Sequence, residues 1–474
     1  MPITSTDLAI FTSRAPVDER LSALAAAAIL DTLAVLAAGS GEDAVGRIAS
    51  TFWPQQGSRS QPSFDPGIRL RPEDAALLYG TAAHALDLDD VSMLAILHPS
   101  APVVAALLAA RPWSELTGPD LCDAHVIGTE VMIRTGQAIG FDHYRLGYHA
   151  TATMGIFGAT SAVARLLKLD AETTAAALAI AASLASGLRL NFGSMMKPVH
   201  VGIAAANALR AIAWACAGVD ATGRDLFGPD GVFEALSGGS QVVWPDGVEL
   251  GAPFAIESPG FESKRYPCCY LLHKIIALGA ETWRAGVRLD EIATMRVELP
   301  QGGTKPLAHP FPASGAQARF SAPYVLIAAI HDGELGFDSF ADAAVARPEL
   351  QARLGDVTVV EVVGAPLTAE QIGAATVRIE LVMTDGSIRR LERTAAPGSP
   401  ADPMSPEDLG DKFVDCVLRG SPGLTQDRAR ALHVDGANAL KSGPLESWLQ
   451  SLWSGLRPAN MADVSRARVG RELA

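Results

Sequence analysis

Apolar residues recur three or four positions apart through the first half of the chain, which is the spacing of one buried helix face. Residues 17–38 carry this pattern, and later segments begin with typical helix starts. Pro72 precedes two acidic residues in a first turn, and Asp170 is placed to cap residues 171–186, which Gly187 ends. Pro198 lies in the first turn of a long helix that ends near residue 218. We therefore expect helix to follow helix to about residue 265.

The pattern changes after about residue 290, where apolar and polar residues alternate as they do in strands. Residues 294–299, 357–363 and 375–383 alternate, and Asp385-Gly386 then predicts a hairpin turn. Residues 322–331 predict a helix, residues 395–406 a proline-rich linker, and the chain becomes helical again from Ser405. We predict a mainly α fold in which a smaller α+β domain interrupts a helical domain, with the site in the cleft between them.

Composition and charge narrow the class of protein. The 474 residues are 49% hydrophobic and 19% charged, as in a globular protein long enough for two domains. The net charge of −14, without a basic stripe, argues against a nucleic-acid partner, and an anionic substrate would need a local positive cluster. The apolar stretches 173–188 and 199–219 are short or carry polar residues, so we expect buried helices and no membrane association. Five scattered cysteines and an N-terminus without a signal-peptide pattern predict a cytoplasmic protein.

Three carboxylates and a histidine lie within residues 84–90, and His98 follows shortly after. Neighbouring carboxylates raise each other's pKa, so one of the three aspartates could act as an acid or base. His84, Asp87 and His98 could instead bind a divalent metal. A solvated helix end with a capping aspartate would explain the same residues, and the spacing leaves all three interpretations open.

His149 and Lys197 each stand where a helix is predicted to begin. The helix dipole lowers the pKa of an imidazole at that end and keeps it neutral, as a general base requires. Lys197 is predicted at the N-cap, where free N–H groups attract anions, and Arg189 adds a second positive charge upstream. Such a pair would clamp a carboxylate or donate a proton to an enolate. A structural histidine and a surface lysine are the simpler interpretation.

Two later segments add candidate groups. Lys264 supplies positive charge beside the thiols of Cys268 and Cys269, with His273 one turn further on, although packing in the core would explain at least one thiol. Tyr324 begins a helix of the α+β segment and is a candidate phenolic acid or a packed aromatic. The chain has no GxGxxG after a strand, no GxxxxGK[ST], no HExxH and no GxSxG, so acid–base chemistry is what remains.

Taken in order, six motifs make the chain resemble the MmgE/PrpD family, which includes 2-methylcitrate dehydratase, cis-aconitate decarboxylase and iminodisuccinate epimerase. The motifs are AHALDLDD (83–90), HPSAPV (98–103), GYHATATMG (147–155), KPVHVG (197–202), KRYPCC (264–269) and FSAPY (320–324). The resemblance covers about residues 5–455. It implies a large all-α domain built from both chain ends, residues 1–268 and 403–474, and a smaller α+β lid domain, residues 269–402. It also implies a homodimer and no cofactor, and we predict no metal ligand.

The resemblance places Asp87, His98, His149, Lys197 and Tyr324 at the active site, and Tyr144 matches a tyrosine that pairs with the lysine in the epimerase branch. From resemblance and residue chemistry together, the predicted catalytic residues are His149, Lys197, Asp87, Tyr324 and Tyr144. The predicted substrate-binding residues are His98, Ser92, Arg189, Lys264, Cys269 and His273.

Two departures from the family pattern bear on the reaction. Where the decarboxylases have a threonine after the aspartate cluster, this chain has Val91 and Ser92, and the loop to His98 is one residue longer. Where they have a histidine after the Tyr/Phe-Pro pair, it has Cys269, and His273 is a candidate to compensate. These changes argue against decarboxylation and leave abstraction of an α-proton intact.

We therefore expect a cofactor-independent, dehydratase-type lyase that acts on a small di- or tricarboxylic acid. His149 would take the α-proton, and Lys197 with the adjacent helix N-terminus would stabilise the enediolate. Tyr324 or Asp87 would protonate the leaving group. The runner-up is an epimerase of a substituted succinate of the iminodisuccinate type, and a cis-aconitate-type decarboxylase ranks below it. A dimeric helical binding protein and a metal-dependent hydratase that uses His84 are also compatible with the sequence.

Overall fold

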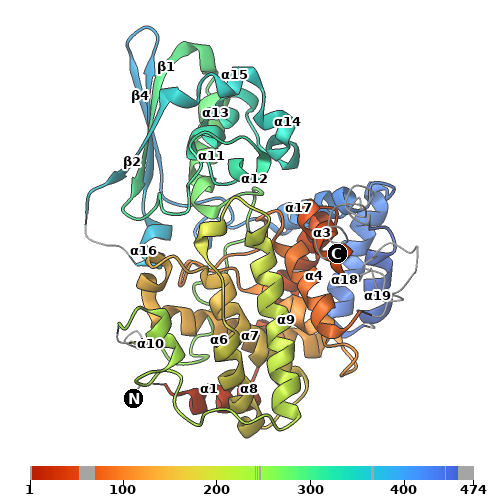
Figure 1. Cartoon of the computed structure of the whole chain (residues 1–474). Helices are drawn as coiled ribbons and strands as arrows, with labels where there is room; N and C mark the ends of the chain where they lie inside the picture. The colour runs from red at the N-terminus through yellow and green to blue at the C-terminus, as the bar shows by residue number, and fades with distance from the viewer. Residues whose placement is uncertain are drawn as a thin grey trace, which may run out of the picture.

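The computed structural model describes residues 3–52, 70–240, 242, 244, 247–364, 368–443 and 445–456. Most of these residues are helical, and the strands among them form one small sheet. Figure 1 shows a large helical part with the sheet and its own helices above it. The prediction of a mainly α fold is confirmed.

The first part of the chain is helical. Its helices are α1 (Ser5–Arg14), α2 (Glu19–Gly39), α3 (Asp43–Thr51), α4 (Pro72–His84), α5 (Ser100–Ala109), α6 (Gly118–Arg145), α7 (Ala150–Leu166), α8 (Ala171–Leu184), α9 (Met196–Cys216) and α10 (Val232–Leu236). The predicted starts at Pro72 and Asp170 are confirmed, since Pro72 opens α4 and the Asp170 carboxylate accepts a hydrogen bond from the Thr173 backbone N–H. The expectation that helix follows helix to residue 265 is wrong, because α10 is the only helix among the described residues between 217 and 265.

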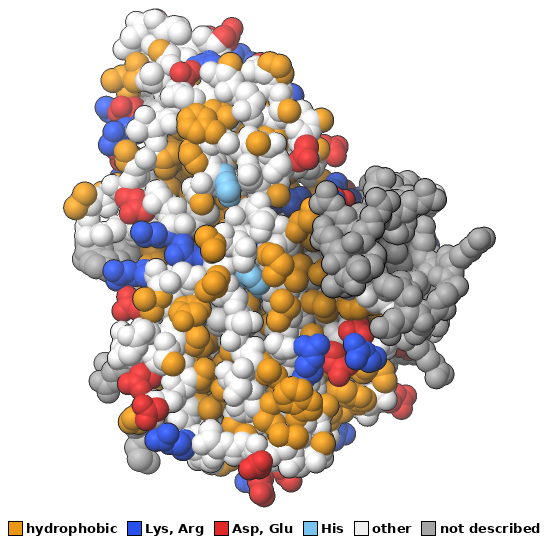
Figure 2. Space-filling view, viewed as in Figure 1, with side chains coloured by type: hydrophobic (Ala, Val, Ile, Leu, Met, Phe, Trp, Pro, Cys, Tyr) orange, Lys and Arg blue, Asp and Glu red, His pale blue; other side chains and the backbone are white. Residues whose placement is uncertain are grey.

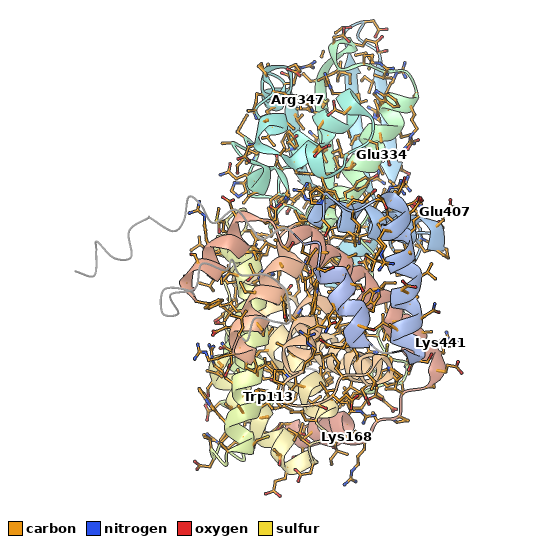
Figure 3. The ribbon with its side chains drawn as sticks, turned by 90° about the vertical axis from the view of Figure 1, so that its right-hand side faces the viewer. Trp113, Lys168, Glu334, Arg347, Glu407 and Lys441 are labelled. Atoms are coloured by element: carbon orange, nitrogen blue, oxygen red, sulfur yellow. The ribbon has the colours of Figure 1, made fainter. Side chains whose placement is uncertain are left out.

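The end of the chain returns to the helical part. It forms α17 (Pro406–Gly420), α18 (Gln426–Ser442) and α19 (Leu445–Trp453). Helices α17 and α18 both contact α2, and α18 also contacts α6. Figure 3 shows these helices, which carry Glu407 and Lys441, running along the helical part, while Glu334 and Arg347 lie in the part above. Helices from both chain ends therefore pack side by side.

A four-stranded sheet forms the centre of the smaller part. Its strands are β1 (Ile292–Pro300), β2 (Val357–Val362), β3 (Val377–Met383) and β4 (Ile388–Arg393), in the order β2-β1-β3-β4. β1 pairs parallel with β2 and antiparallel with β3, and the predicted hairpin joins β3 to β4. The helices of this part are α11 (His273–Arg284), α12 (Gly315–Ala318), α13 (Ala322–Asp332), α14 (Asp342–Val345), α15 (Pro348–Gln351) and α16 (Ala369–Ala374). Short 3₁₀ turns are η1 (Arg189–Asn191), η2 (Tyr270–Leu272), η3 (Leu289–Glu291), η4 (Phe337–Phe340) and η5 (Leu354–Asp356).

The buried apolar residues fall into two large clusters. One joins residues between 8 and 256 with residues between 413 and 456, and the other joins residues between 266 and 383. In the second cluster α11 and α13 pack together, α11 against β3 and α13 against β2. The change from one cluster to the other falls close to the predicted change from helical to mixed sequence. The domain boundaries at 268, 269, 402 and 403, and the action of the smaller part as a lid, stay predictions.

Two helices, α2 and α9, are long and apolar enough to cross a membrane by length and composition. About three fifths of each apolar window, 61%, is buried inside the protein, as in core helices of the fold. Figure 2 shows hydrophobic side chains gathered over the helical part of one face. The large apolar side chains exposed around the start of α9 are Leu188, Leu190, Met195 and Met196. A homodimer would cover such a surface, and both the homodimer and the cytoplasmic location stay predictions.

Candidate active site

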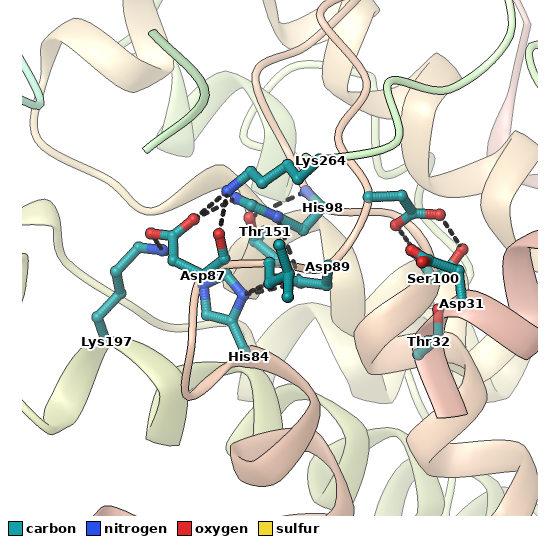
Figure 4. Close-up of polar contacts among 12 residues, drawn as sticks. Asp31, Thr32, His84, Asp87, Asp89, His98, Ser100, Thr151, Lys197 and Lys264 are labelled. Carbon is teal, nitrogen blue, oxygen red and sulfur yellow. Dashed lines mark hydrogen bonds and ion pairs between the residues drawn. The ribbon is translucent and has the colours of Figure 1, made fainter. Parts of the chain in front are cut away.

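Asp87 lies at the centre of a buried cluster of charged side chains (Figure 4). It follows the end of α4 in a turn with a positive φ of 52°, a strained backbone that aspartate tolerates better than most residues. One carboxylate oxygen accepts a hydrogen bond from Lys197 Nζ at 2.5 Å, and the other contacts Lys264 Nζ. Lys264 also donates to the Asp87 carbonyl oxygen at 2.9 Å. The turn therefore holds one carboxylate between two lysines that are distant in the sequence.

Two histidines connect this carboxylate to Asp89. His84, the last residue of α4, places Nδ1 2.8 Å from the Asp89 carboxylate and Nε2 2.8 Å from Lys197 Nζ. Since a carboxylate and an ammonium flank the ring, Nδ1 carries the hydrogen and Nε2 accepts from the lysine. His98 lies 3.2 Å from Asp89 through Nδ1 and 3.8 Å from Asp87 through Nε2. The predicted cluster of residues 84–98 is thus brought together.

His149 lies beside this cluster as the N-cap residue of α7, at the predicted helix entrance. Its ring lies 5.7 Å from the His84 ring between centroids and 5.0 Å from that of Phe192, a ring that Lys197 also approaches. Its Nδ1 is 3.3 Å from Nδ1 of His200. His149 and Lys197 are therefore neighbours, and one of the two facing Nδ1 atoms carries the hydrogen that joins His149 to His200.

The N-cap position predicted for Lys197 is wrong. The helix α9 begins one residue earlier, at Met196, with Met195 as its N-cap. Lys197 is only 4% exposed, and its ammonium group turns away from the helix end towards Asp87 and His84. A salt bridge holds it in place, and the free N–H groups of the helix make no part of that contact.

Burial and charge set the protonation states in the cluster. Burial opposes ionisation of Asp87, but Lys197 and Lys264 outweigh it and hold its pKa well below the ordinary value. Burial, assisted by Lys197, lowers the pKa of His84 to about 4, and burial with the same lysine lowers the pKa of His149 well below its ordinary value. The predicted neutral state of His149 thus agrees with the direction of the shift, although burial is the larger cause.

The charges of the cluster nearly cancel. When the histidines are neutral, the two lysines are balanced by Asp87 and by Asp89, whose pKa His84 and His98 hold low against the effect of burial. The sequence analysis predicts a local excess of positive charge at the site. Among the described residues, those at the centre of the cluster do not supply this excess. An anion that enters must find further positive charge or cause a histidine to take up a proton.

His84, Asp89 and His98 could hold a metal ion by geometry, since one ligand atom from each lies within 4.8 Å of the others. His84 already directs Nδ1 to Asp89 and Nε2 to the ammonium of Lys197. A divalent cation there would lie next to that ammonium group and would be repelled by it. The donor set therefore fits an internal hydrogen-bond network better than a metal centre.

A pocket of about 410 Å³ opens beside the cluster, between the helical part and the segments around α12 and η4. Its lining includes His84, Asp87, Lys197, Arg319, Phe320 and Arg419, together with Glu42 from the N-cap of α3. Lys197 and Asp87 thus face an open space into which a small anion fits.

The structure does not bring Tyr324 to this pocket, which corrects its predicted place. Its side chain is fully buried in the core of the smaller part, and its hydroxyl donates to the Ser339 carbonyl oxygen. Burial raises the pKa of Tyr324 to about 12. His273 is likewise buried, between the rings of Tyr266 and Tyr270, and does not line the pocket.

Three other predicted residues lie at the edge of the cluster. Arg189 stacks on the Tyr144 ring at 4.5 Å and donates to the carbonyl oxygens of Tyr144 and Lys305, so its charge is used in holding the segment before α9. Among the described residues, neither Arg189 nor Tyr144 forms a hydrogen bond with Lys197. Ser92 pairs through its backbone with Leu97, in the loop that leads to His98, and its buried hydroxyl has no described partner.

Family models match nearly the whole described chain. The MmgE/PrpD N-terminal domain matches residues 7–245, and the MmgE/PrpD C-terminal domain matches residues 266–434. This chain belongs to the MmgE/PrpD family. The resemblance seen in the six sequence motifs is therefore confirmed.

Several curated relatives of this chain are named cis-aconitate decarboxylase. The chain is 29% identical over 382 residues to a cis-aconitate decarboxylase of Homo sapiens, covering 77% of this chain and 75% of that protein. It is 27% identical to a cis-aconitate decarboxylase of Mus musculus, covering 81% and 80%, and 26% identical to one of Aspergillus terreus, covering 81% and 83%. Since MmgE/PrpD proteins of this kind are lyases, the prediction of an enzyme is confirmed.

Sequence reasoning missed several residues at the pocket or cluster, and two of them, His200 and Arg319, lie in or beside a family motif. His200 lies in the KPVHVG motif but received no role, although one helical turn separates it from Lys197. Arg319 directly precedes the FSAPY motif and lines the pocket. Cys269, which was predicted, donates its backbone N–H to the Arg319 carbonyl oxygen at 2.9 Å, and burial with the nearby Asp87 raises the pKa of its thiol to about 11.

Proposed function

We propose that this chain is a cofactor-independent lyase that acts on a small tricarboxylate by moving a proton at a carbon beside a carboxylate. The observation that carries the proposal is the cluster in which Lys197 and Asp87 line an open pocket, while the neutral His149, which is not part of the described lining, lies with its ring 5.7 Å from that of the pocket-lining His84. The curated relatives support a tricarboxylate substrate, because they are named for cis-aconitate. The six family motifs support the same class of reaction.

In the proposed reaction, His149 takes or returns the proton on carbon. Its burial keeps it neutral near pH 7, and its contact with His200 orients the ring. Lys197 stabilises the negative charge that develops on the substrate carboxylate, a contribution that can reach about 3–4 kcal/mol for one well-placed donor. Asp87 holds that ammonium in position.

The proton for the leaving group is assigned to the histidines rather than to Asp87. The low pKa of Asp87 keeps it ionised, so it has no proton to give near neutral pH. Tyr324 lies in the core of the smaller part. His84 is neutral in the resting site, so the proton is the one that His149 takes from carbon, and His84, which lines the pocket with its ring 5.7 Å from that of His149, is the nearest ring that can pass it on.

Two reactions share this chemistry, loss of water and loss of carbon dioxide. The names of the relatives favour decarboxylation. Cys269 and the Val91-Ser92 pair, which stand where decarboxylases have other residues, favour dehydration. We keep the dehydratase-type reaction as the leading proposal, decarboxylation as the second candidate, and an epimerase of a substituted succinate as the third.

One assay separates these reactions. The purified chain is incubated in deuterated water with citrate, 2-methylcitrate, cis-aconitate and substituted succinates, while alkene absorbance, carbon dioxide and label in the substrate are followed. We expect alkene formation without carbon dioxide. Carbon dioxide release identifies a decarboxylase, and label without either identifies an epimerase. Activity that survives exhaustive chelation excludes the metal-dependent hydratase, and a chain that neither turns over nor labels any of these acids contradicts the proposal.

Replacing Lys197 tests the cluster itself. Lys197→Met keeps the length of the side chain and removes the charge, so we expect turnover to fall at least about a hundredfold, as for loss of one preorganised donor. Lys441→Met removes an exposed lysine of α18 and serves as the matched control, with activity unchanged. Circular dichroism and a thermal melt establish that both variants fold. A fully active, folded Lys197→Met variant would remove Lys197 from the mechanism.

A further inference from the structure

Arg319 lines the same pocket as Lys197 and lies between α12 and α13. Its side chain is 12% exposed, so the charged guanidinium is largely removed from water. Nη1 donates to the Ala85 carbonyl oxygen at 3.0 Å, in the turn that leads from His84 to Asp87. The arginine is therefore tied to the backbone that carries the centre of the cluster.

The hydrogen-bonding capacity of this guanidinium is mostly unused. An arginine has five N–H donors, and the Ala85 carbonyl oxygen accepts from one nitrogen only. Nε is buried without a hydrogen-bond partner among the described residues, and Nη2 is 3.9 Å from the Glu42 carboxylate, too far for a hydrogen bond. A buried charged donor without partners is costly, and a ligand carboxylate would satisfy it.

Glu42 lies between two arginines at the same pocket. One carboxylate oxygen accepts a hydrogen bond from Arg419 Nη2 at 3.0 Å, and the other lies at the longer distance from Arg319. These three side chains come from the start of α3, the turn after α12 and the end of α17, and all three line the pocket. A protein carboxylate thus already occupies the place between two guanidinium groups where a ligand carboxylate would fit.

The charge balance at the pocket explains why a substrate would need these arginines. The lysines at the centre are neutralised by Asp87 and Asp89, so the cluster alone offers a substrate little net attraction. Arginine binds carboxylates through two parallel hydrogen bonds and keeps its charge when buried, so it suits a carboxylate that is held without reacting. A tricarboxylate could place one carboxylate at Lys197 and another at Arg319 in the same pocket.

We propose that Arg319, together with Arg419, binds a non-reacting carboxylate of the substrate, and that Glu42 occupies this subsite until the substrate displaces it. The inference rests on the proposed function, because it assumes a polycarboxylate substrate. Arg319 selects substrates with an additional carboxylate, and Glu42 sets how tightly they bind. Neither residue takes part in moving the proton.

Calorimetric binding to propane-1,2,3-tricarboxylate and to glutarate tests the subsite, since neither acid can lose water. We expect Arg319→Gln to weaken binding of the tricarboxylate roughly ten- to hundredfold, the loss typical of one partner in a buried charged pair, and to change glutarate binding much less. Glu42→Gln removes the competing carboxylate, so we expect the tricarboxylate to bind more tightly. Opposite signs for the two variants would not arise if the arginine and the glutamate only held the fold together.

Arg378→Gln is the matched control, because Arg378 forms an exposed pair with Glu392 on the hairpin β3–β4, away from the pocket. It should bind both acids like the wild type. If Arg319→Gln does not fold, the tightening by Glu42→Gln and a weakening by Arg419→Gln decide the question. If the wild type binds the tricarboxylate and these variants bind it equally well, the subsite is overturned while the proposed function stands. If the wild type binds neither acid, the proposed function fails and the subsite falls with it.

Discussion

The protonation of the site at the residue scale follows from which charges face one another. Asp87 keeps two ammonium groups within hydrogen-bond distance, and all three side chains are buried. His84 lies between one of these ammonium groups and Asp89. Burial and, to a smaller extent, the charge of Lys197 disfavour the protonated ring of His84. Together they lower the pKa of His84 to about 4. Any change in the charge near Lys197 must therefore change the affinity of this ring for a proton.

We expect the protein to take up a proton when an anion binds in the pocket. A carboxylate near Lys197 offsets the repulsion that lowers the pKa of His84, so that pKa rises towards its ordinary value and the ring is partly protonated on binding. Affinity for propane-1,2,3-tricarboxylate should then increase as the pH falls from about 6.5 towards about 4, which is the interval between the ordinary pKa of an imidazole and the lowered pKa of His84 in the empty site. Calorimetry in buffers of different ionisation enthalpy measures the protons taken up.

The control for this prediction is His84→Gln, which keeps a polar side chain and removes the titrating ring. Its binding enthalpy should depend less on the buffer than that of the wild type. Equal enthalpies in all buffers for the wild type would contradict the coupling between anion and proton.

The distance between His84 and Lys197 is fixed at the scale of elements by how closely α4 and α9 approach. His84 ends α4 and Lys197 is near the start of α9. The two helices touch through Gly80 and Gly202, where a Cβ on Gly202 would lie 2.2 Å from the Leu77 carbonyl oxygen. Only hydrogen atoms fit between these backbones, so the contact brings the two functional side chains together.

Gly202→Ala is expected to disturb the site without touching any of its side chains. The added methyl group meets rigid backbone, so the helices must separate, at a cost of about 1–3 kcal/mol in the free energy of unfolding. Activity should fall as well, because His84 and Lys197 move apart. Urea unfolding and turnover measure the two effects.

Gly410 in α17 is the matched control, since a Cβ there makes only ordinary contacts with His433 at 3.5 Å. Gly410→Ala should leave activity unchanged and raise stability by up to about 1 kcal/mol, because alanine favours the helix. If Gly202→Ala were as stable and active as Gly410→Ala, the close helix contact would not determine the geometry of the site.

Local sequence signals were sufficient for most of these elements. Prolines in first turns and the capping Asp170 mark helix starts, and alternation with Asp385-Gly386 marks the strands and hairpin, because each depends on neighbours in sequence. The N-cap at Lys197 failed for a tertiary reason: a buried salt bridge with Asp87 decided where the side chain goes. The irregular backbone of the described residues between 217 and 265, apart from α10, was missed because apolar residues there do not distinguish helix from packed loop.

The site at the scale of the whole molecule combines residues from both parts, and this limits what the sequence predicts. Family motifs brought forward Asp87, His149 and Lys197, since each motif is local. Arg319 donates a hydrogen bond to Ala85, which is 234 residues away in the sequence. A local sequence pattern cannot predict a contact between residues so far apart. Tyr324 shares a motif with the pocket-lining Phe320, but its own position on α13 directs it into the core of the smaller part.

Buried histidines govern how the whole fold responds to acid. Burial lowers the pKa of His84 and His143 to about 4 and that of His125 and His273 to about 3. Between about pH 6.5 and 4 the unfolded chain binds these protons and the folded chain does not, so stability falls as the pH falls. Each fully expressed shift is worth on the order of 3 kcal/mol.

Two buried carboxylates act in the opposite direction but are outnumbered. Burial raises the pKa of Asp90 to about 7 and that of Glu262 to about 8, so the folded chain binds protons there that the unfolded chain has released. Since more histidines than carboxylates shift in this range, the net effect is destabilisation. We expect the urea midpoint to fall steadily between about pH 6.5 and about pH 4.5, where unfolded histidines take up protons.

Single replacements identify the histidines as the cause. His125→Gln removes a ring that is fully buried and that contacts Ser100 Oγ at 2.9 Å, so the slope of the midpoint against pH should become shallower. His331→Gln removes a surface ring that pairs with Asp332 and should leave the slope as it is. The sign of the wild-type slope shows whether the buried histidines or the buried carboxylates dominate. A urea midpoint that rises as the pH falls would mean that Asp90 and Glu262 dominate. The prediction that buried histidines control acid stability would then be wrong, and so would the neutral state assigned to the histidines around Asp87.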